Sequence, residues 1–122
     1  MALRMAIKKI EDATKNNHGC ELTFLLAYDG KQDMLQAMNA AGKGGGKISE
    51  ETILKNLWTG ALPAVDFVIR TGGEPHWSSG FMMWQTADSE FYFTKTLWPA
   101  FGKEEFEKAL GEFEKRRRMG GK

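Results

Sequence analysis

The sequence predicts an α/β domain with a partial parallel sheet flanked by helices, and three observations lead to this class. Short apolar runs at residues 21–28, 65–69 and 91–94 are typical of buried strands. Segments with helical spacing of apolar residues alternate with these runs, as in parallel sheets. Two or three strands make a narrow sheet, and parallel strands need cover on both faces. We therefore expect part of the sheet to be missing or supplied by a partner.

Four helices are expected around this sheet. The first runs over residues 3–13, the second follows Asp29-Gly30, the third follows Ser49 as its N-cap, and the fourth spans 103–118. The first helix has Leu3, Ala6, Ile7, Ile10 and Ala13 at helical spacing, and the second carries Met34, Leu35, Ala37 and Met38 on one side. The third is expected to bury Ile53, Leu54, Leu57 and Trp58, and on the fourth Phe106, Ala109, Leu110 and Phe113 share one face. The first helix is thus expected to contribute to the core, with no strand before it.

Length, charge and cysteine content exclude several classes of protein. The 122 residues fit a single domain, and the net charge of +1 gives no reason to expect nucleic-acid binding. The single cysteine, Cys20, excludes an internal disulfide framework and fits a reducing compartment. No apolar run approaches the roughly 20 residues of a membrane span, and residues 1–10 lack a signal-peptide pattern. We expect a cytoplasmic protein with at most peripheral membrane contact through a lipid product.

A candidate anion site follows the strand at 65–69. Arg70-Thr71-Gly72-Gly73 stands at its carboxyl end, where open α/β sheets place their ligand sites. Arginine can bind phosphate oxygens with two parallel hydrogen bonds, and glycines let backbone amides approach an anion. Taken alone, the five residues from Arg70 to Glu74 fit a surface arginine beside a glycine turn better than an anion site.

Three other features were considered as binding sites, and only one of them supports a candidate residue. The glycine-rich stretch 42–47 fails as a phosphate loop, because Ile48 stands where Ser or Thr should follow Lys47 and a helix precedes it. No His/Cys cluster has the spacing of a zinc site. Glu90 could help to hold Mg²⁺, which binds through one or two carboxylates and substrate phosphates, or it could lie in a solvated acidic turn.

Several collinear motifs then resemble one family. The run from Asp66 to Glu74, Asp-Phe-Val-Ile-Arg-Thr-Gly-Gly-Glu, is similar to the signature of the cis-prenyltransferases, the family of undecaprenyl diphosphate synthase. Further matches at consistent spacing are Phe81-Met82-Met83-Trp84-Gln85, Ser89-Glu90-Phe91-Tyr92-Phe93-Thr94, Leu97-Trp98-Pro99 with Phe101, and Arg118-Met119-Gly120-Gly121. Upstream, Ala27-Tyr28-Asp29-Gly30-Lys31 with Asp33 looks like a divergent Asn-Tyr-Gly-Gly-Arg element. The resemblance covers nearly the whole chain.

The resemblance implies an enzyme that joins isopentenyl diphosphate to an allylic diphosphate, releases pyrophosphate with Mg²⁺, and usually works as a dimer. Carried over to this sequence, Arg70 would grip the diphosphate of isopentenyl diphosphate, and Ser78 or Ser79 would donate a hydrogen bond to it. Glu90 would ligate Mg²⁺, and the element around Arg118 and Gly120 would reach a diphosphate across the dimer.

This sequence differs from the family's diphosphate-binding pattern at two places. His76 stands where the family has its second diphosphate-binding arginine, so binding there should be weaker or pH-dependent. The segment from Pro75 to Gly80 holds one residue more than the family's loop, which leaves Ser78 and Ser79 as alternatives; Ser78 keeps the family's spacing from His76.

The third departure is an absence. Nothing in residues 1–10 resembles the strand ending in Asp-Gly-Asn-Gly-Arg-Trp with which the family's first half opens. We expect residues 1–122 to be a single domain equivalent to the family's C-terminal half, active only with a chain that supplies the N-terminal half. The alternative is a non-catalytic diphosphate-binding or dimerisation subunit.

Overall fold

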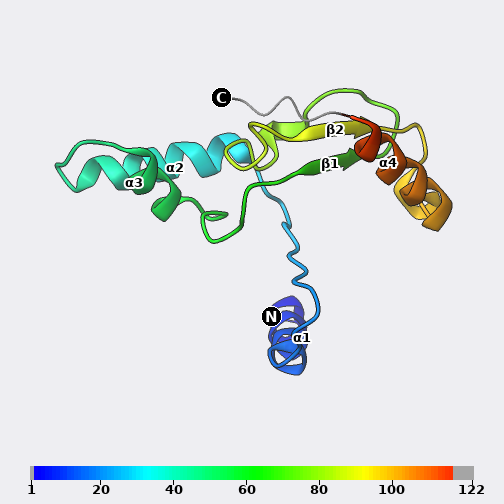
Figure 1. Cartoon of the computed structure of the whole chain (residues 1–122). Helices are drawn as coiled ribbons and strands as arrows, with labels where there is room; N and C mark the ends of the chain where they lie inside the picture. Colours follow the sequence, from blue (N-terminus) through cyan, green and yellow to red (C-terminus); the bar gives the residue numbers. More distant parts are fainter. Residues whose placement is uncertain (1, 117–122) are drawn as a thin grey trace.

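The computed structural model describes residues 2–116, and within them four α-helices and a two-stranded parallel sheet (Figure 1). The elements in chain order are α1 (Ala2–Thr14), α2 (Gly30–Lys43), α3 (Glu50–Asn56), β1 (Phe67–Arg70), the 3-10 helix η1 (Ser78–Gly80), β2 (Glu90–Phe93), the 3-10 helix η2 (Trp98–Ala100) and α4 (Lys103–Lys115). The α/β class and the parallel pairing predicted from the sequence are confirmed. None of the helices within residues 2–116 is long and apolar enough to cross a membrane.

The sheet has two different faces. β1 and β2 pair in parallel from Phe67 opposite Glu90 to Arg70 opposite Phe93, so alternate residues point to opposite sides. One side packs on α4, where the ring centroids of Phe67 and Phe113 lie 4.8 Å apart. The other side carries Phe93 and Arg70, and it is partly covered by the loop between β1 and η1. The sheet is therefore flanked by a helix on one face and by a loop on the other.

Helices α2 and α3 pack together and hold the described core. The buried residues Ala37, Ile53 and Leu57 form its centre. The N-cap predicted at Ser49 is confirmed, and the Thr52 hydroxyl accepts a hydrogen bond from the Ser49 amide, which completes a capping box. Trp58 is the exception on this helix: it was expected in the core, but it is 62% exposed because it lies beyond the end of α3.

The fully buried Asp33 joins this helical pair to the rest of the fold. The four groups that donate hydrogen bonds to its two carboxylate oxygens are the Tyr28 hydroxyl (3.0 Å), the Gln36 side-chain amide (3.1 Å), the Trp58 backbone amide (2.7 Å) and the Thr59 hydroxyl (3.0 Å). Gln85 in turn donates to the Thr59 carbonyl at 2.7 Å. A buried charge is tolerated because these donors replace its water.

The strand predicted over residues 21–28 is wrong. Residues 21–25 have no regular secondary structure, and none of them belongs to the sheet formed by β1 and β2. Leu22, Phe24 and Leu26 are 74%, 71% and 63% exposed. An apolar run forms a strand only when a neighbouring strand accepts its hydrogen bonds, and none of the described residues does so here.

Helix α1 forms as predicted, but the core role expected for it is also wrong. None of its described residues is buried, and Leu3 and Met5 are 62% and 69% exposed. Figure 1 shows α1 standing apart from the other elements at the end of the extended segment. At the other end of the chain, α4 ends at Lys115, three residues before the predicted end, with Arg116 as its C-cap.

Candidate diphosphate site

Arg70 is the last residue of β1, and its side chain folds over the loop that follows. Its Nη1 donates to the carbonyl oxygen of His76, and its Nη2 donates to Oε2 of Glu74 at 3.3 Å. The side chain is 21% exposed. A guanidinium has five N–H donors, so these two bonds leave others for a phosphate oxygen. The structure thus brings the Arg70 guanidinium to the backbone of His76, and the diphosphate-binding roles expected of both side chains stay predictions.

The two glycines after Arg70 have a different role from the expected one. Gly72 and Gly73 have φ angles of +99° and +84°, which favour glycine. Their amides donate to the carbonyl oxygens of Thr96 (3.0 Å) and Thr94 (2.9 Å). These amides extend the pairing beyond β2 and do not point at an anion, so the prediction that they approach one is wrong.

Ser78 and Ser79 lie at the exposed start of η1. Neither hydroxyl makes a hydrogen bond to another described residue, so both are available to a ligand. Trp77 anchors the loop just before them: its indole N–H donates to the carbonyl of Phe81 at 2.9 Å, and its ring meets Phe91 edge-on at 6.4 Å. Because Phe91 shares its sheet face with Arg70, the loop places the serines on the side of the sheet that carries the guanidinium.

The serine loop rests on the start of α2, a support that the sequence did not reveal. A Cβ atom added to Gly30 would lie 1.8 Å from the carbonyl oxygen of Gly80. Asp29 caps the same helix and accepts a hydrogen bond from the Gln32 amide at 3.0 Å. The one available signal was the Asp29-Gly30 pair inside the divergent Ala-Tyr-Asp-Gly-Lys element.

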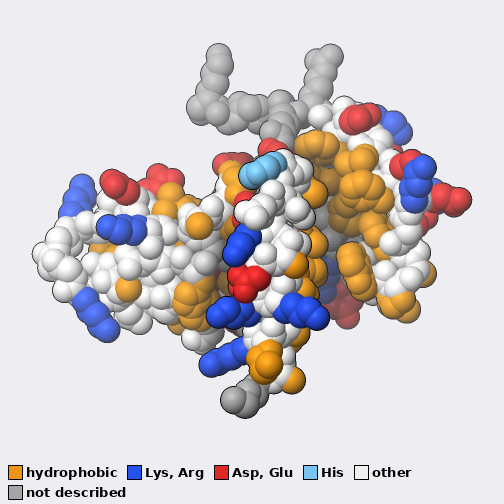
Figure 2. Space-filling view, turned by 90° about the horizontal axis from the view of Figure 1, so that it is seen from below, with side chains coloured by type: hydrophobic (Ala, Val, Ile, Leu, Met, Phe, Trp, Pro, Cys, Tyr) orange, Lys and Arg blue, Asp and Glu red, His pale blue; other side chains and the backbone are white. Residues whose placement is uncertain are grey.

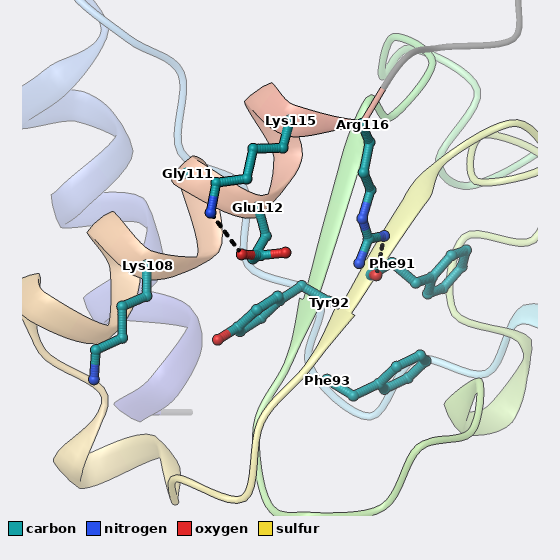
Figure 3. A pocket seen from close by; sticks show the side chains of 8 residues that line it. All are labelled: Phe91, Tyr92, Phe93, Lys108, Gly111, Glu112, Lys115 and Arg116. Atoms are coloured by element: carbon teal, nitrogen blue, oxygen red, sulfur yellow. Dashed lines mark hydrogen bonds and ion pairs between the residues drawn. The ribbon is translucent and has the colours of Figure 1, made fainter.

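Glu90 lies away from this cluster. It is paired with Phe67, three residues before Arg70, which corresponds to about 10 Å along the sheet. It also belongs to the face that packs on α4, where Arg116 Nη1 donates to its Oε2 at 3.0 Å. Figure 3 shows this division, with Tyr92 pointing toward α4 while Phe91 and Phe93 point away.

Residues 2–116 do not by themselves assemble a Mg²⁺ site. Magnesium binds through one or two carboxylates together with substrate phosphates. Glu90 faces away from Arg70 and is paired with Arg116. Among residues 2–116 there is no group of three or more His, Cys, Asp or Glu side chains that could hold a metal ion.

A second pocket, of about 660 Å³, lies between the outer edge of β2 and α4 (Figure 3). Its three cations suggest an anion site, but each is paired with a carboxylate: Lys108 with Glu105, Lys115 with Glu112 and Arg116 with Glu90. The pocket is therefore a weaker candidate than the Arg70 loop. The remaining predicted contacts, Arg118 and Gly120, lie outside the described residues.

Burial raises the pKa of Tyr28, and the hydrogen bond to the Asp33 carboxylate raises it further. Both effects favour the neutral phenol, which is the form that can donate to Asp33. Tyr28 thus supports the start of α2, on which the serine loop rests, but its hydroxyl is already engaged.

Comparison with known proteins identifies the family. A family model described as "Putative undecaprenyl diphosphate synthase" matches residues 1–121. The isoprenyl transferase of Neisseria gonorrhoeae is 41% identical over 117 residues, which are 95% of this chain and 47% of that protein. Nerylneryl diphosphate synthase CPT2 of Solanum lycopersicum is 43% identical over 130 aligned residues, covering 99% of this chain and 40% of that protein.

Solved structures agree with this result. The crystal structure of a probable undecaprenyl diphosphate synthase from Campylobacter jejuni matches 99% of this chain and 57% of its own, with 28% identity and a TM-score of 0.80. Lavandulyl diphosphate synthase from Lavandula x intermedia matches 95% of this chain and 52% of its own, with 32% identity and a TM-score of 0.82. The chain spans about half the length of the curated relatives it matches. The chain therefore belongs to the undecaprenyl diphosphate synthase family of prenyltransferases.

Proposed function

We propose that this chain carries the isopentenyl diphosphate site of a cis-prenyltransferase of isoprenoid biosynthesis. The observation that carries the proposal is the position of Arg70, at the carboxyl end of a parallel strand and inside a loop with His76 and two free serine hydroxyls. The reaction would join isopentenyl diphosphate to an allylic diphosphate and release pyrophosphate.

The proposed binding step is an exchange of partners at Arg70. Glu74 is an exposed carboxylate held at 3.3 Å, and such surface pairs contribute only about 0–1 kcal/mol. A diphosphate carries more charge and offers two oxygens to the planar fork, so it would displace Glu74. Ser78 would add a hydroxyl donor, with Ser79 as the alternative, and His76 would add a weaker one than the family's arginine.

The full reaction, in this proposal, needs a second polypeptide that supplies the other half of the transferase. The chain matches about half of each relative, and Glu90 does not meet Arg70 within it. Mg²⁺ would then be held between Glu90, the substrate diphosphates and groups from another chain. Arg118 and Gly120 would contact a diphosphate in a dimer.

A second candidate function is a non-catalytic diphosphate-binding subunit of such a transferase. The observation that favours it is the same separation of Glu90 from the Arg70 loop, because a binding subunit needs the loop alone. The two candidates share a binding step and differ in turnover.

Turnover separates them. The purified chain is incubated with Mg²⁺, isopentenyl diphosphate and farnesyl diphosphate, alone and with the separately expressed half of the Neisseria gonorrhoeae isoprenyl transferase that this chain does not match. The split-enzyme proposal expects pyrophosphate release only from the mixture. Release by this chain alone would contradict the need for a partner, and no release from the mixture would favour the binding subunit.

A further inference from the structure

An apolar surface of this chain has no cover in the structure. It consists of α1 and residues 20–26, and its exposed large side chains are Leu3, Met5, Ile7, Ile10, Leu22, Phe24 and Leu26. A hollow of about 890 Å³ lies between the two segments. In Figure 2, seen from below, the face of α1 turned to the viewer carries mainly charged side chains, and the broadest hydrophobic area lies beside it, on the side that holds α4 in Figure 1. Apolar areas of this extent mark an interaction site.

The same region offers unpaired strand edges. Residues 21–25 belong to the drawn-out connection between α1 and α2 (Figure 1), and no described residue forms a backbone ladder with them. In the described sheet β1 pairs with β2 along one edge only, and the two-stranded sheet has no further member. Open edges of this kind are templates for strand addition. Apolar cover and strand pairing are thus both missing in one region.

The solved structures indicate what occupies the region. The Campylobacter jejuni protein matches 99% of this chain with a TM-score of 0.80, so α1 and the extended segment are included in the matched arrangement. The match uses only 57% of that protein's chain. In this chain none of the described residues of α1 is buried. The part of that longer chain outside the match is therefore the candidate cover for an arrangement that has no buried residue of its own here.

We propose that α1, residues 20–26 and the open edge of β1 form one docking surface for a polypeptide equivalent to the other half of an isoprenyl transferase. This polypeptide adds at least one strand to the sheet and covers the apolar face of α1. The inference rests on the proposed function, because it names where the second polypeptide of that transferase binds.

Binding is tested with the full 122-residue chain and the unmatched half of the Neisseria gonorrhoeae enzyme as the probe, by light scattering coupled to gel filtration and by calorimetry. The substitution Leu22→Asp places a charge in the docking surface. Leu97→Asp is the matched control, since Leu97 is 65% exposed and lies between β2 and η2. We expect a one-to-one complex that Leu22→Asp weakens at least tenfold and Leu97→Asp leaves unchanged.

Hydrogen exchange gives the second readout. In the complex, the amides of residues 22–26 and those of Phe67 and Ile69 in β1 should exchange at least tenfold more slowly than in the free chain. Three results would overturn the proposal. The first is no complex at 50 µM of each chain, which is about the weakest affinity that a useful subunit pair would show. The others are equal effects of the two substitutions and a homodimer that Leu22→Asp dissociates.

Binding and turnover can fail separately. A complex that depends on Leu22 but releases no pyrophosphate supports the docking surface and contradicts the catalytic proposal. Pyrophosphate release from a mixture in which Leu22→Asp has no effect overturns the docking surface and leaves the catalytic proposal standing.

Discussion

Gly30, the first residue of α2, lies directly against the carbonyl of Gly80, the last residue of η1. A Cβ atom on Gly30 would stand 1.8 Å from that oxygen, a separation that no real contact allows. The helix therefore begins immediately beneath the loop that presents Ser78 and Ser79. The shape of the candidate diphosphate loop is fixed by a helix 50 residues away in sequence.

Gly30→Ala should destabilise the fold by about 2 kcal/mol, because the methyl group forces α2 away from η1. The displaced loop should also bind isopentenyl diphosphate at least tenfold more weakly. Gly42→Ala is the control in the same helix, since a Cβ there meets nothing within 4 Å. That change should be neutral or stabilise by up to about 1 kcal/mol. Urea unfolding and calorimetry measure both, and equal effects would contradict the role of the Gly30–Gly80 contact.

Asp33→Asn should cost at least about 2 kcal/mol of unfolding free energy, because an amide nitrogen replaces an oxygen that accepts buried donors. Asp12→Asn on exposed α1 is the control, and it should change stability by less than about 0.5 kcal/mol. Urea titration compares the midpoints. A midpoint for Asp33→Asn equal to that of Asp12→Asn would show that the buried network does not stabilise the fold.

Tyr28 should make stability fall at high pH. Its pKa is raised in the folded chain, so folding favours the neutral phenol. This contribution is fully present below the unfolded-state pKa of about 10 and is lost as pH rises through the higher folded-state value. Urea midpoints at pH 8 and pH 11 are compared with those of Tyr28→Phe, which has no such group. An equal loss in both proteins would assign the effect to other residues.

Glu90→Gln should leave the affinity of this chain alone for isopentenyl diphosphate unchanged within about twofold, which is under 0.5 kcal/mol. The reason is that Glu90 lies on the α4 face and Arg70 lies on the other. Calorimetry without a partner measures this. A tenfold loss would place Glu90 beside the diphosphate and contradict the arrangement of the two faces.

The parts of the fold that depend on local sequence could be predicted. Ser49 caps α3 because its hydroxyl accepts a hydrogen bond from the amide of Thr52, three residues away. The strands β1 and β2 were predictable from two short apolar runs, which pair with each other in the structure. Residues 21–28 have the same apolar character, yet they form no strand, because pairing depends on a neighbour and not on the run itself. The apolar face of α1 is exposed for a similar reason, because no described residue packs on it closely enough to bury it.

The candidate site shows the same division. The position of Arg70 at a strand end followed from the run before it, whereas the role expected of His76 rested on the family resemblance and stays a prediction. The amide directions of Gly72 and Gly73 could not be predicted, since they depend on the carbonyls of Thr94 and Thr96 beyond β2. The separation of Glu90 from Arg70 depends on how β1 and β2 align, and this alignment joins two segments that lie far apart in the sequence.

In the proposed function, Arg70 binds the diphosphate of isopentenyl diphosphate. Calorimetric titration of the chain with isopentenyl diphosphate, in the presence of Mg²⁺, tests it most directly. Arg70→Ala should weaken binding by about 1.5–3 kcal/mol, roughly ten- to a hundredfold, whereas Arg4→Ala on exposed α1 should leave it unchanged. Arg70→Lys should fall between them, because it keeps the charge and loses the fork. Equal affinity of the wild-type and Arg70→Ala chains would contradict the claim and place the diphosphate elsewhere.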